Sequence, residues 1–499
     1  MDRYDLLIVG GGINGAGIAR DAAGRWLSVL LVEQDDLAGH TSSASTKLIH
    51  GGLRYLEYGE FRLVHEALAE RERLWAMAPH IIWPLRFVLP QTRSPRPAWM
   101  VRLGLFLYDH LGGRRRLPGT ETVPLSAGLG EGLADRAGRA FVYSDCWVED
   151  SRLVVLNALD AAERGATIRT RTRLIAARRE GEGWTVTIED AAGTHAVAAR
   201  ALVNAAGPWV ADVLGRSGGA AHDHGIRLVK GSHIVVPRLY PGDHAFMLQN
   251  PDRRIVFAIP YEGAFTLVGT TDQPWTAAPG PAAIDAGETE YLLATIARYF
   301  TRDLTAADIV WSYAGIRPLH DDKAKSASAV TRDYVLDLDA GVGRAPLLSI
   351  YGGKITTYRR LAEHALAELA PLVPMAPAWT AGAALPGGDM ADFDAFLRGV
   401  EAEHPDVPRP LLRRLCRAYG TRVSAILDGD LGPDLGGGLH TAELDYLVAK
   451  EWARTAEDVL WRRSKLGLHV PPGTAERLAD CLATYPLSSS HHKSDISAS

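Results

Sequence analysis

The first part of the chain is a series of short apolar runs separated by glycine turns and small residues. "YDLLIVG", from Tyr4 to Gly10, is an apolar run ending at glycine, which is typical of a buried strand, and "LSVLLVE", from Leu27 to Glu33, repeats the pattern. Between them, "GINGAGIARDAAGRW" has helical spacing and many small residues. Two buried strands joined by a helix predict a β-α-β unit with parallel strands.

Farther along the chain the pattern becomes mixed. A helix is expected from His65 to His80, and the stretch 81–140, rich in Pro, Gly and Arg, is expected to be less regular. "DSRLVVLNALDAAERGATI", residues 150–168, predicts an amphipathic helix that leads into a strand. Alternating runs such as "SHIVVP" and "AFTLVGTTD" between 223 and 333 predict an antiparallel sheet, and the chain beyond Gly388 has mostly helical spacing.

Composition narrows the class of protein. The chain has 499 residues, too many for one core, and its 47% hydrophobic and 23% charged residues are ordinary for a soluble globular protein. A net charge of -5 gives no reason to expect nucleic-acid binding. Cys146, Cys416 and Cys481 are far apart, so we expect no metal site and a reducing compartment. With no signal-peptide layout and no apolar run of about 18 residues, a cytosolic or membrane-peripheral protein is expected.

The turn after the first strand carries a dinucleotide-binding motif. In "GGGING", Gly10, Gly12 and Gly15 satisfy G-x-G-x-x-G, which combines a tight turn, close approach to a pyrophosphate and close helix–strand packing. Glu33 ends the second strand, where a carboxylate accepts hydrogen bonds from an adenosine ribose and disfavours a 2′-phosphate. FAD and NAD therefore remain, and NADP is disfavoured.

A second segment favours FAD over NAD. In "ALVNAAGPWV", residues 201–210, a strand ends in small residues that let the backbone close over a cofactor. The segment resembles the second fingerprint of the glutathione-reductase-like FAD proteins. A motif at the start of a long chain that is interrupted by other sheet material also suits a flavoprotein.

Five segments together resemble one family. They are "YDLLIVGGGINGAGIARDAAGR", "SSASTKLIHGGLRYLEYGEFRLVHEALAERE", "LVNAAGPW", "YAGIRPL" and "LSIYGGKITTYRRLAE". In this order they are similar to the FAD-dependent glycerol-3-phosphate dehydrogenases, above all the bacterial aerobic, membrane-associated type. The resemblance is specific up to about Gly388 and looser beyond it.

The resemblance implies an α/β fold with three parts. These are a glutathione-reductase-like FAD-binding Rossmann domain, an antiparallel-sheet substrate or capping domain, and a C-terminal helical domain. The expected ranges are 1–80, 141–222 and 331–380 for the discontinuous FAD-binding domain, 81–140 and 223–330 for the substrate-binding domain, 388–485 for the helical domain, and 486–499 for a disordered tail.

The resemblance also implies an activity. Oxidation of sn-glycerol 3-phosphate to dihydroxyacetone phosphate moves a hydride from C2 to flavin N5, and the electrons pass to a membrane quinone. Such a site needs cations for the phosphate, a proton acceptor and donors for the developing alkoxide. The implied location is the cytoplasmic face of the inner membrane, with peripheral attachment; a homodimer is one assembly left open.

Several residues suit the substrate pocket. Arg54, Arg317 and Arg332 are candidates for the phosphate, because a guanidinium donates two parallel bonds. His233, in "KGSHIVVP", is the expected proton acceptor because an unperturbed histidine titrates near neutrality, and His50 is its rival. Arg317 and Lys354 are assigned beside His233 as catalytic, and the remaining pocket residues are Tyr55, Thr270 and Asp272.

The cofactor is expected to lie along several glycine-rich segments. The hydroxyls that follow Glu33 suit the pyrophosphate and ribityl chain, and backbone N–H groups near Lys354 suit the pyrimidine edge of a reduced flavin. The residues assigned to FAD are Gly10, Gly12, Ile13, Asn14, Gly15, Glu33, Thr41, Ser42, Ser45, Thr46, Lys47, His50, Gly51, Gly52, Leu53, Ala206, Gly207, Trp209, Gly315, Gly353, Lys354, Ile355 and Thr356.

Other readings stay open at this point. "RPAWMVRLGLFLYDHLGGRRR", residues 96–116, is either an interfacial membrane helix or a helix that faces the core. The acceptor is either a quinone or, as in a glycerol-3-phosphate oxidase, oxygen. An amine or amino-acid oxidase of the same fold and a non-catalytic FAD-binding scaffold are the remaining alternatives.

Overall fold

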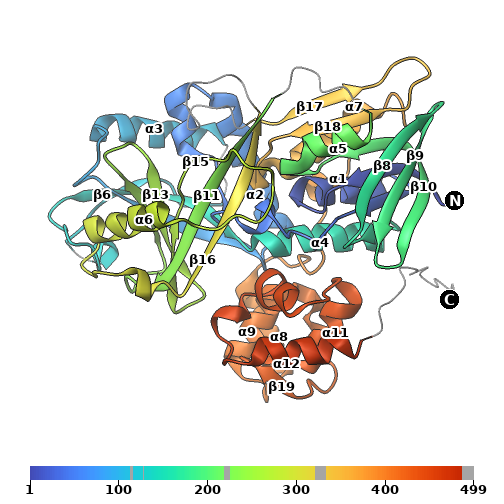
Figure 1. The fold of residues 1–499 in the computed structure, drawn as a ribbon. Helices are drawn as coiled ribbons and strands as arrows, with labels where there is room; N and C mark the ends of the chain where they lie inside the picture. Colours follow the sequence, from blue (N-terminus) through green and yellow to red (C-terminus); the bar gives the residue numbers. More distant parts are fainter. Residues whose placement is uncertain (113–115, 127, 219–224, 321–332, 486–499) are drawn as a thin grey trace.

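Two sheets and a group of C-terminal helices make up the molecule. The computed structural model describes residues 1–112, 116–126, 128–218, 225–320 and 333–485. Figure 1 shows the two sheets side by side, with the C-terminal helices as a separate group below α4. Arg332 and the expected tail 486–499 lie outside the described residues.

The first sheet has the parallel core that the apolar runs predict. Its strand order is β17-β18-β10-β1-β2-β7, and the β8–β9 hairpin continues from β10. β1 pairs in parallel with both β2 and β10, so Leu6, Leu7 and Ile8 are fully buried. The strands are β1 (Arg3–Val9), β2 (Val29–Val32), β7 (Thr167–Arg169), β8 (Arg173–Glu180), β9 (Gly183–Asp190), β10 (Gly193–Asn204), β17 (Val335–Asp339) and β18 (Leu347–Tyr351).

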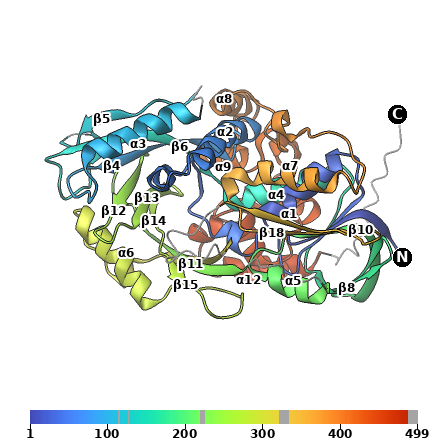
Figure 2. The same ribbon diagram turned by 90° about the horizontal axis from the view of Figure 1, so that it is seen from above.

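Three helices pack together beside this sheet, α1 (Ile13–Gly24), α4 (Asp150–Glu163) and α7 (Tyr358–Leu369), as Figure 2 also shows. Small residues allow the close packing, because a Cβ on Gly17 would lie 2.7 Å from the Tyr358 ring. The helix expected at 150–168 and the strand after it are confirmed as α4 and β7, but the helix is not amphipathic, since every residue of α4 from Asp150 to Ala161 is buried. α4 is covered by α1 on one side and by the C-terminal group on the other.

The second sheet contains the antiparallel strands expected after residue 223. β11 (Ile226–Pro237) pairs along its length with β16 (Trp311–His320), and the strand order is β15-β11-β14-β13-β12-β4-β6-β3. β5 joins the sheet through β6. The other strands are β3 (Leu48–Ile49), β4 (Ile82–Pro90), β5 (Glu121–Pro124), β6 (Arg139–Val148), β12 (Ala245–Gln249), β13 (Ile255–Tyr261), β14 (Phe265–Gly269) and β15 (Gln273–Pro274).

The stretch 81–140 is more regular than expected. It forms β4, β5 and the helix α3 (Ala98–Leu111). The helix agrees with the helical reading of residues 96–116, whereas the two strands were not expected. The helix expected at 65–80 is α2 (Phe61–Met77), which begins four residues earlier. Figure 2 shows α3 and α6 (Ala286–Tyr299) at the end of the molecule opposite the N-terminus.

The C-terminal group has its own apolar core, which includes Leu412, Leu415, Leu444, Leu447 and Leu478. The π-helical turn η9 (Asp458–Arg463) lies on the side that meets the first sheet's helices. The helices are α8 (Phe393–Glu403), α9 (Arg409–Tyr419), α10 (Ser424–Leu427), α11 (Thr441–Lys450) and α12 (Thr474–Ala483), and a short hairpin joins β19 (Asp434–Gly436) to β20 (Leu439–His440).

The division into three domains stays a prediction. The sheet assignments bear on one boundary, because β6 (Arg139–Val148) pairs with β4 in the second sheet. The expected boundary at residue 141 therefore falls inside a strand of the second sheet.

Candidate functional site

The glycine turn after β1 is shaped by close backbone approaches. Gly10 has φ +113°, and a Cβ there would lie 2.5 Å from the Ala205 carbonyl oxygen at the end of β10. A Cβ on Gly15 would lie 1.9 Å from the Gly10 oxygen, so only glycine fits. Ser42 Oγ accepts from the Ile13 N–H at 3.0 Å and so brings the segment after β2 against the start of α1.

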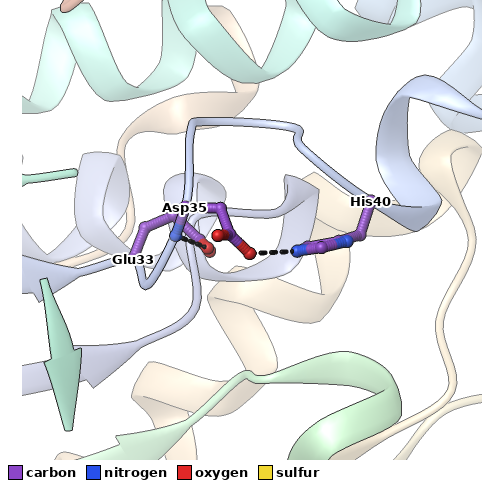
Figure 3. Close-up of side chains that lie close together, drawn as sticks. All are labelled: Glu33, Asp35 and His40. Carbon is purple, nitrogen blue, oxygen red and sulfur yellow. Dashed lines mark hydrogen bonds and ion pairs between the residues drawn. The ribbon is translucent and has the colours of Figure 1, made fainter. Parts of the chain in front are cut away.

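The loop after β2 places an acidic side chain at this turn. Glu33 accepts from the Gly11 N–H at 2.6 Å and from the Asp35 N–H at 2.9 Å, as Figure 3 shows for the second bond. Asp35 in turn lies 2.7 Å from His40 Nε2. Burial raises the pKa of the Glu33 carboxyl, and these N–H donors oppose that shift. Each Glu33 oxygen retains acceptor capacity for a ribose hydroxyl.

A cavity lies at the carboxyl ends of the parallel strands, between the glycine turn and the β10 fingerprint. Eleven of the residues assigned to FAD line it: Gly10, Gly12, Ile13, Asn14, Glu33, Thr41, Ser42, Ala206, Gly207, Trp209 and Gly353. Sequence reasoning missed Thr172, Arg173 and Leu174, which also line it and which follow β7. Their position after β7 could have predicted them, because the carboxyl end of this third parallel strand lies at the same edge of the sheet.

These features fit FAD on structural grounds. The glycine approaches leave space at the start of α1, whose N-terminus offers N–H groups to phosphate. Asn14 donates to the Gly352 carbonyl at 3.1 Å, while its buried Oδ1 has no hydrogen-bond partner in the described chain. Asn14 therefore holds α1 against the Gly352–Gly353 turn and keeps a polar atom for a bound group.

The segment Thr41–Lys47, which we call the bridging loop, connects the two sheets. Thr41 Oγ1 donates to the Ile316 carbonyl at 2.6 Å, and Tyr313 OH donates to the Ser45 carbonyl at 2.8 Å. A Cβ on Gly315 would lie 2.6 Å from Ala44 Cβ, so Gly315 allows the loop to lie flat on β16. The loop thus runs from the glycine turn to the face of the β11–β16 ladder.

Lys47 ends the bridging loop with its side chain turned inward. Its Nζ lies 2.7 Å from Asp150 Oδ1, and both side chains have 0% exposure. Asp150 also accepts from Ser45 Oγ at 2.7 Å. Ser45 and Lys47, both assigned to FAD from the sequence, therefore anchor the loop to the start of α4. Their direct contact with the cofactor stays a prediction.

His233 lies on β11 directly opposite Tyr313 of β16, and the two rings stack at 4.8 Å. Its Nε2 lies 3.0 Å from Thr46 Oγ1 in the bridging loop, and its buried Nδ1 has no hydrogen-bond partner in the described chain. Burial is the main cause that lowers the pKa of His233 well below its ordinary value, and the charges of Lys47 and Arg317 act in the same direction. The ring is therefore neutral at neutral pH and able to accept a proton.

Arg317 lies on the same face of the ladder as His233. It follows Tyr313, the residue paired with His233, by four positions on β16, and alternate residues of a strand point to the same side. Its Nη1 lies 2.8 Å from Asp272 Oδ1, and its Nη2 donates to the Thr271 carbonyl at 2.7 Å. A Cβ on Gly231 would lie 2.2 Å from Arg317 Nη2 and 2.7 Å from Thr270 Oγ1. The structure thus brings His233, Arg317, Thr270 and Asp272 together, with Gly231 leaving space for the guanidinium.

A second group forms where the Gly51–Gly52 segment meets the turn after β18. Lys354 Nζ lies 3.9 Å from the centroid of the Tyr55 ring, which fits a cation–π contact. The His50 N–H donates to Thr356 Oγ1 at 3.3 Å. Gly52 has φ +77°, and a Cβ there would lie 2.2 Å from the Tyr55 ring. The neighbouring assigned residues Leu53 and Ile355 begin the short helices η2 (Leu53–Tyr58) and η6 (Ile355–Thr357).

Arg54 is placed differently from Arg317. It lies on η2, and its Nη2 donates to Tyr58 OH at 3.3 Å, while its buried Nε has no hydrogen-bond partner in the described chain. Its role in binding phosphate stays a prediction. The third arginine candidate, Arg332, lies outside the described residues.

Comparisons with known proteins agree with this arrangement. Residues 5–359 match the family model "FAD dependent oxidoreductase", and residues 378–485 match "C-terminal domain of alpha-glycerophosphate oxidase". The fold and the site define an FAD-dependent oxidoreductase.

Individual relatives narrow the family. The chain is 55% identical over 487 residues to a glycerol-3-phosphate dehydrogenase from Pseudomonas aeruginosa, covering 96% of this chain and 95% of the relative. It is 52% identical to a D-erythritol 1-phosphate dehydrogenase from Brucella abortus, covering 95% and 96%. A Bacillus halodurans glycerol-3-phosphate dehydrogenase, solved in complex with FAD, has a TM-score of 0.72 at 28% identity and covers 93% of this chain and 86% of its own. The chain belongs to the FAD-dependent glycerol-3-phosphate dehydrogenase family, and its cofactor is FAD.

Proposed function

We propose that this protein oxidises sn-glycerol 3-phosphate to dihydroxyacetone phosphate. The observation that carries the proposal is the face of the β11–β16 ladder, where a neutral, buried His233 lies beside the Arg317 guanidinium and under the bridging loop. The near full-length identity to a protein named glycerol-3-phosphate dehydrogenase supports the same substrate.

Each residue then has a distinct task. Bound FAD supplies the two-electron acceptor. His233 takes the proton of the C2 hydroxyl, for which its unpartnered Nδ1 is the free ring position. Arg317, held by Asp272 and the Thr271 carbonyl, presents its guanidinium to the phosphate. Lys354, on the turn after β18, adds positive charge beside Tyr55.

An anaerobic titration with sn-glycerol 3-phosphate, followed by flavin absorbance, tests the proposal. Flavin bleaching in proportion to added substrate is expected, and flavin that stays oxidised would refute it. Arg317→Ala is expected to raise KM on the order of tenfold or more while FAD stays bound. His233→Ala is expected to slow flavin reduction by about a hundredfold or more in a single turnover. An unchanged KM or rate would remove the corresponding residue from its role.

A second candidate substrate is D-erythritol 1-phosphate, because a relative with that name is 52% identical over 486 residues. It is also a phosphorylated polyol and needs the same cation and proton acceptor. The two substrates are compared by kcat/KM for flavin reduction under identical anaerobic conditions. We expect the higher value for sn-glycerol 3-phosphate, and the reverse order would reassign the substrate.

We further propose a membrane quinone as electron acceptor and peripheral attachment to the cytoplasmic face of the inner membrane. α3 buries Val101, Leu105 and Tyr108, and it exposes Trp99 by 70% and Phe106 by 52%. Met100 and Leu103 are also exposed, so α3 carries an apolar outer face. Figure 1 places the helix itself at the edge of the body, away from the C-terminal helices.

An interfacial membrane helix and a core-facing helix, the two readings of residues 96–116, do not exclude each other. The reason is that α3 has one apolar side toward the core and another toward the outside. Within the described chain, no helix combines the length and apolarity needed to cross a bilayer. Steady-state turnover with a short-chain quinone, compared with oxygen uptake, tests the acceptor. Faster turnover with the quinone is expected, whereas stoichiometric peroxide formation would make the protein an oxidase.

A further inference from the structure

The C-terminal helical group contacts the adenosine end of the cofactor site through η9. Arg463 donates to both oxygens of Asp36, at 2.6 and 2.8 Å, and Arg462 Nε donates to the same carboxylate at 2.7 Å. Asp36 is 2% exposed and the Arg463 side chain 0% exposed. Three charge-assisted bonds on one buried carboxylate are strong and little screened by salt.

Asp36 belongs to the loop that shapes the glycine turn. That loop bonds both polar groups of Gly11, because Glu33 Oε2 accepts from the Gly11 N–H at 2.6 Å and the Ala38 N–H donates to the Gly11 carbonyl at 3.1 Å. Glu33, Ala38 and the neighbouring Gln34 line the cofactor cavity. A shift of Asp36 would therefore move residues that line the cavity where Glu33 is expected to meet the adenosine ribose.

A second link joins η9 to the same loop. The backbone N–H of Arg171 donates to the Asp35 carbonyl at 2.7 Å, and the Arg171 side chain donates to Asp458 Oδ2 at 2.6 Å. Asp458 also accepts from the N–H groups of Arg454 and Thr455, so η9 is itself held at its start. The loop after β2 is thus tied to the C-terminal group from two sides.

We propose that Arg463 and Arg462 are positioning residues for FAD: by holding Asp36 they hold the Glu33–Ala38 loop in the conformation that binds the adenosine ribose. The C-terminal group then contributes to cofactor retention although η9 does not line the cavity. The inference concerns FAD binding, so it stands or falls independently of the substrate proposed above.

The test measures FAD affinity and apoprotein stability separately on the full-length chain. FAD is removed and rebound, and its Kd is measured for Arg463→Met, Asp36→Asn and the double variant; thermal unfolding of each apoprotein is recorded alongside. Arg463→Met is expected to raise the Kd for FAD on the order of tenfold. The double variant is expected to bind FAD no more weakly than the worse single variant, because both changes break the same Arg463–Asp36 contact.

A matched control exists at the same boundary. Arg422 of the C-terminal group donates to both oxygens of Glu163, the last residue of α4, at 2.7 Å each, and neither residue lines the FAD cavity. Arg422→Met removes a two-bond contact between the same parts of the fold, and it is expected to lower apoprotein stability slightly and to leave the Kd for FAD within about twofold of wild type. An equal rise in Kd for this control would overturn the proposal, because the effect would then be general loss of docking.

Milder variants keep the test decisive if Arg463→Met does not fold. Arg462→Gln removes a single bond to Asp36, and Arg463→Lys keeps the charge with fewer bonds. Both are expected to raise the Kd for FAD, but severalfold less than Arg463→Met or Asp36→Asn does. If Arg462→Gln and Asp36→Asn, each as a single variant, both keep the wild-type Kd for FAD, the proposal is overturned, even if their thermal stability falls.

Discussion

Gly231→Ala tests whether the position of Arg317, and not only its charge, matters for substrate binding. The new Cβ would lie 2.2 Å from Arg317 Nη2, so the guanidinium must retreat by roughly 1 Å or more to reach ordinary van der Waals distance. The obstructed atoms are the far ends of flexible side chains, and Gly231 does not have a positive φ. We therefore expect a loss of folding stability below about 1 kcal/mol.

The effect on catalysis is expected to be larger. A displacement of roughly 1 Å at a positioning group can cost up to about a hundredfold, so kcat/KM for anaerobic flavin reduction should fall by about tenfold to a hundredfold. Stopped-flow reduction over a range of substrate concentrations measures it, and the bound-flavin spectrum confirms that FAD is retained. If the change acts through Arg317, adding Gly231→Ala to Arg317→Ala should cost little more. An unchanged kcat/KM, or additive losses in the double variant, would refute the reasoning.

Three further predictions concern the pH dependence, the bridging loop and the membrane face. Because the folded pKa of His233 lies well below 6.5, flavin reduction should stay level as pH falls through 6.5 and decline only at lower pH; a midpoint at or above 6.5 would contradict this. Lys47→Met should cost about 3–5 kcal/mol of stability in thermal or denaturant unfolding, since it leaves Asp150 buried and unpaired, whereas a loss below about 1 kcal/mol would show that the pair is not needed. Trp99→Ser with Phe106→Ser should weaken binding to anionic lipid vesicles on the order of tenfold or more in a sedimentation assay, with flavin reduction by soluble substrate unchanged; wild-type vesicle binding would exclude this face.

The first sheet could be predicted because its signals are local. Each of its buried strands is an apolar run that stops at a turn, and Gly10, Gly15 and Glu33 follow from the geometry of a β-α-β unit. The alternating run around His233 in "KGSHIVVP", residues 230–237, likewise predicts that His233 faces one side of a sheet, and the structure places it on the same side as Arg317.

Strand β4, in the region 81–140, was not predicted, and the reason is physical. Pro84 makes "IWPLRFVLP" an unfavourable strand sequence, since proline cannot donate a hydrogen bond to the ladder, and Arg86 interrupts its apolar run. In the structure, β4 pairs with β12 only at Phe87 and Val88, whereas Pro84 lies in the part that pairs with β6. The missing N–H of Pro84 therefore falls outside the two-sided section of the strand, a circumstance set by tertiary pairing.

The site was predictable by segment, and the direction of His233 by strand alternation, but the direction of side chains with distant partners was not. Lys47 follows the hydroxyl run, which suggests a cofactor contact, yet its partner Asp150 lies 103 residues away in sequence and draws the side chain into the core. Asp36 and Arg463 are 427 residues apart, and neither carries a local signal of the other. Contacts of this range arise from how the parts of the fold pack, and a single sequence does not encode them in any local pattern.

These distant contacts have a common consequence for the two halves of the cofactor site. The loop after β2 is fixed by η9 through Asp36, and the bridging loop that follows is fixed by α4 through Lys47 and by β16 through Thr41. The chain from Glu33 to Lys47 is therefore held near its start by the C-terminal group and farther along by β16 and α4. Because the same short segment carries Glu33 at one end and meets His233 at the other through Thr46, its anchors set the distance between Glu33, the proposed ribose ligand, and His233, the proposed proton acceptor. A loosened anchor at either end should thus change FAD affinity and flavin reduction to different degrees, with Asp36 acting mainly on the first and Lys47 mainly on the second.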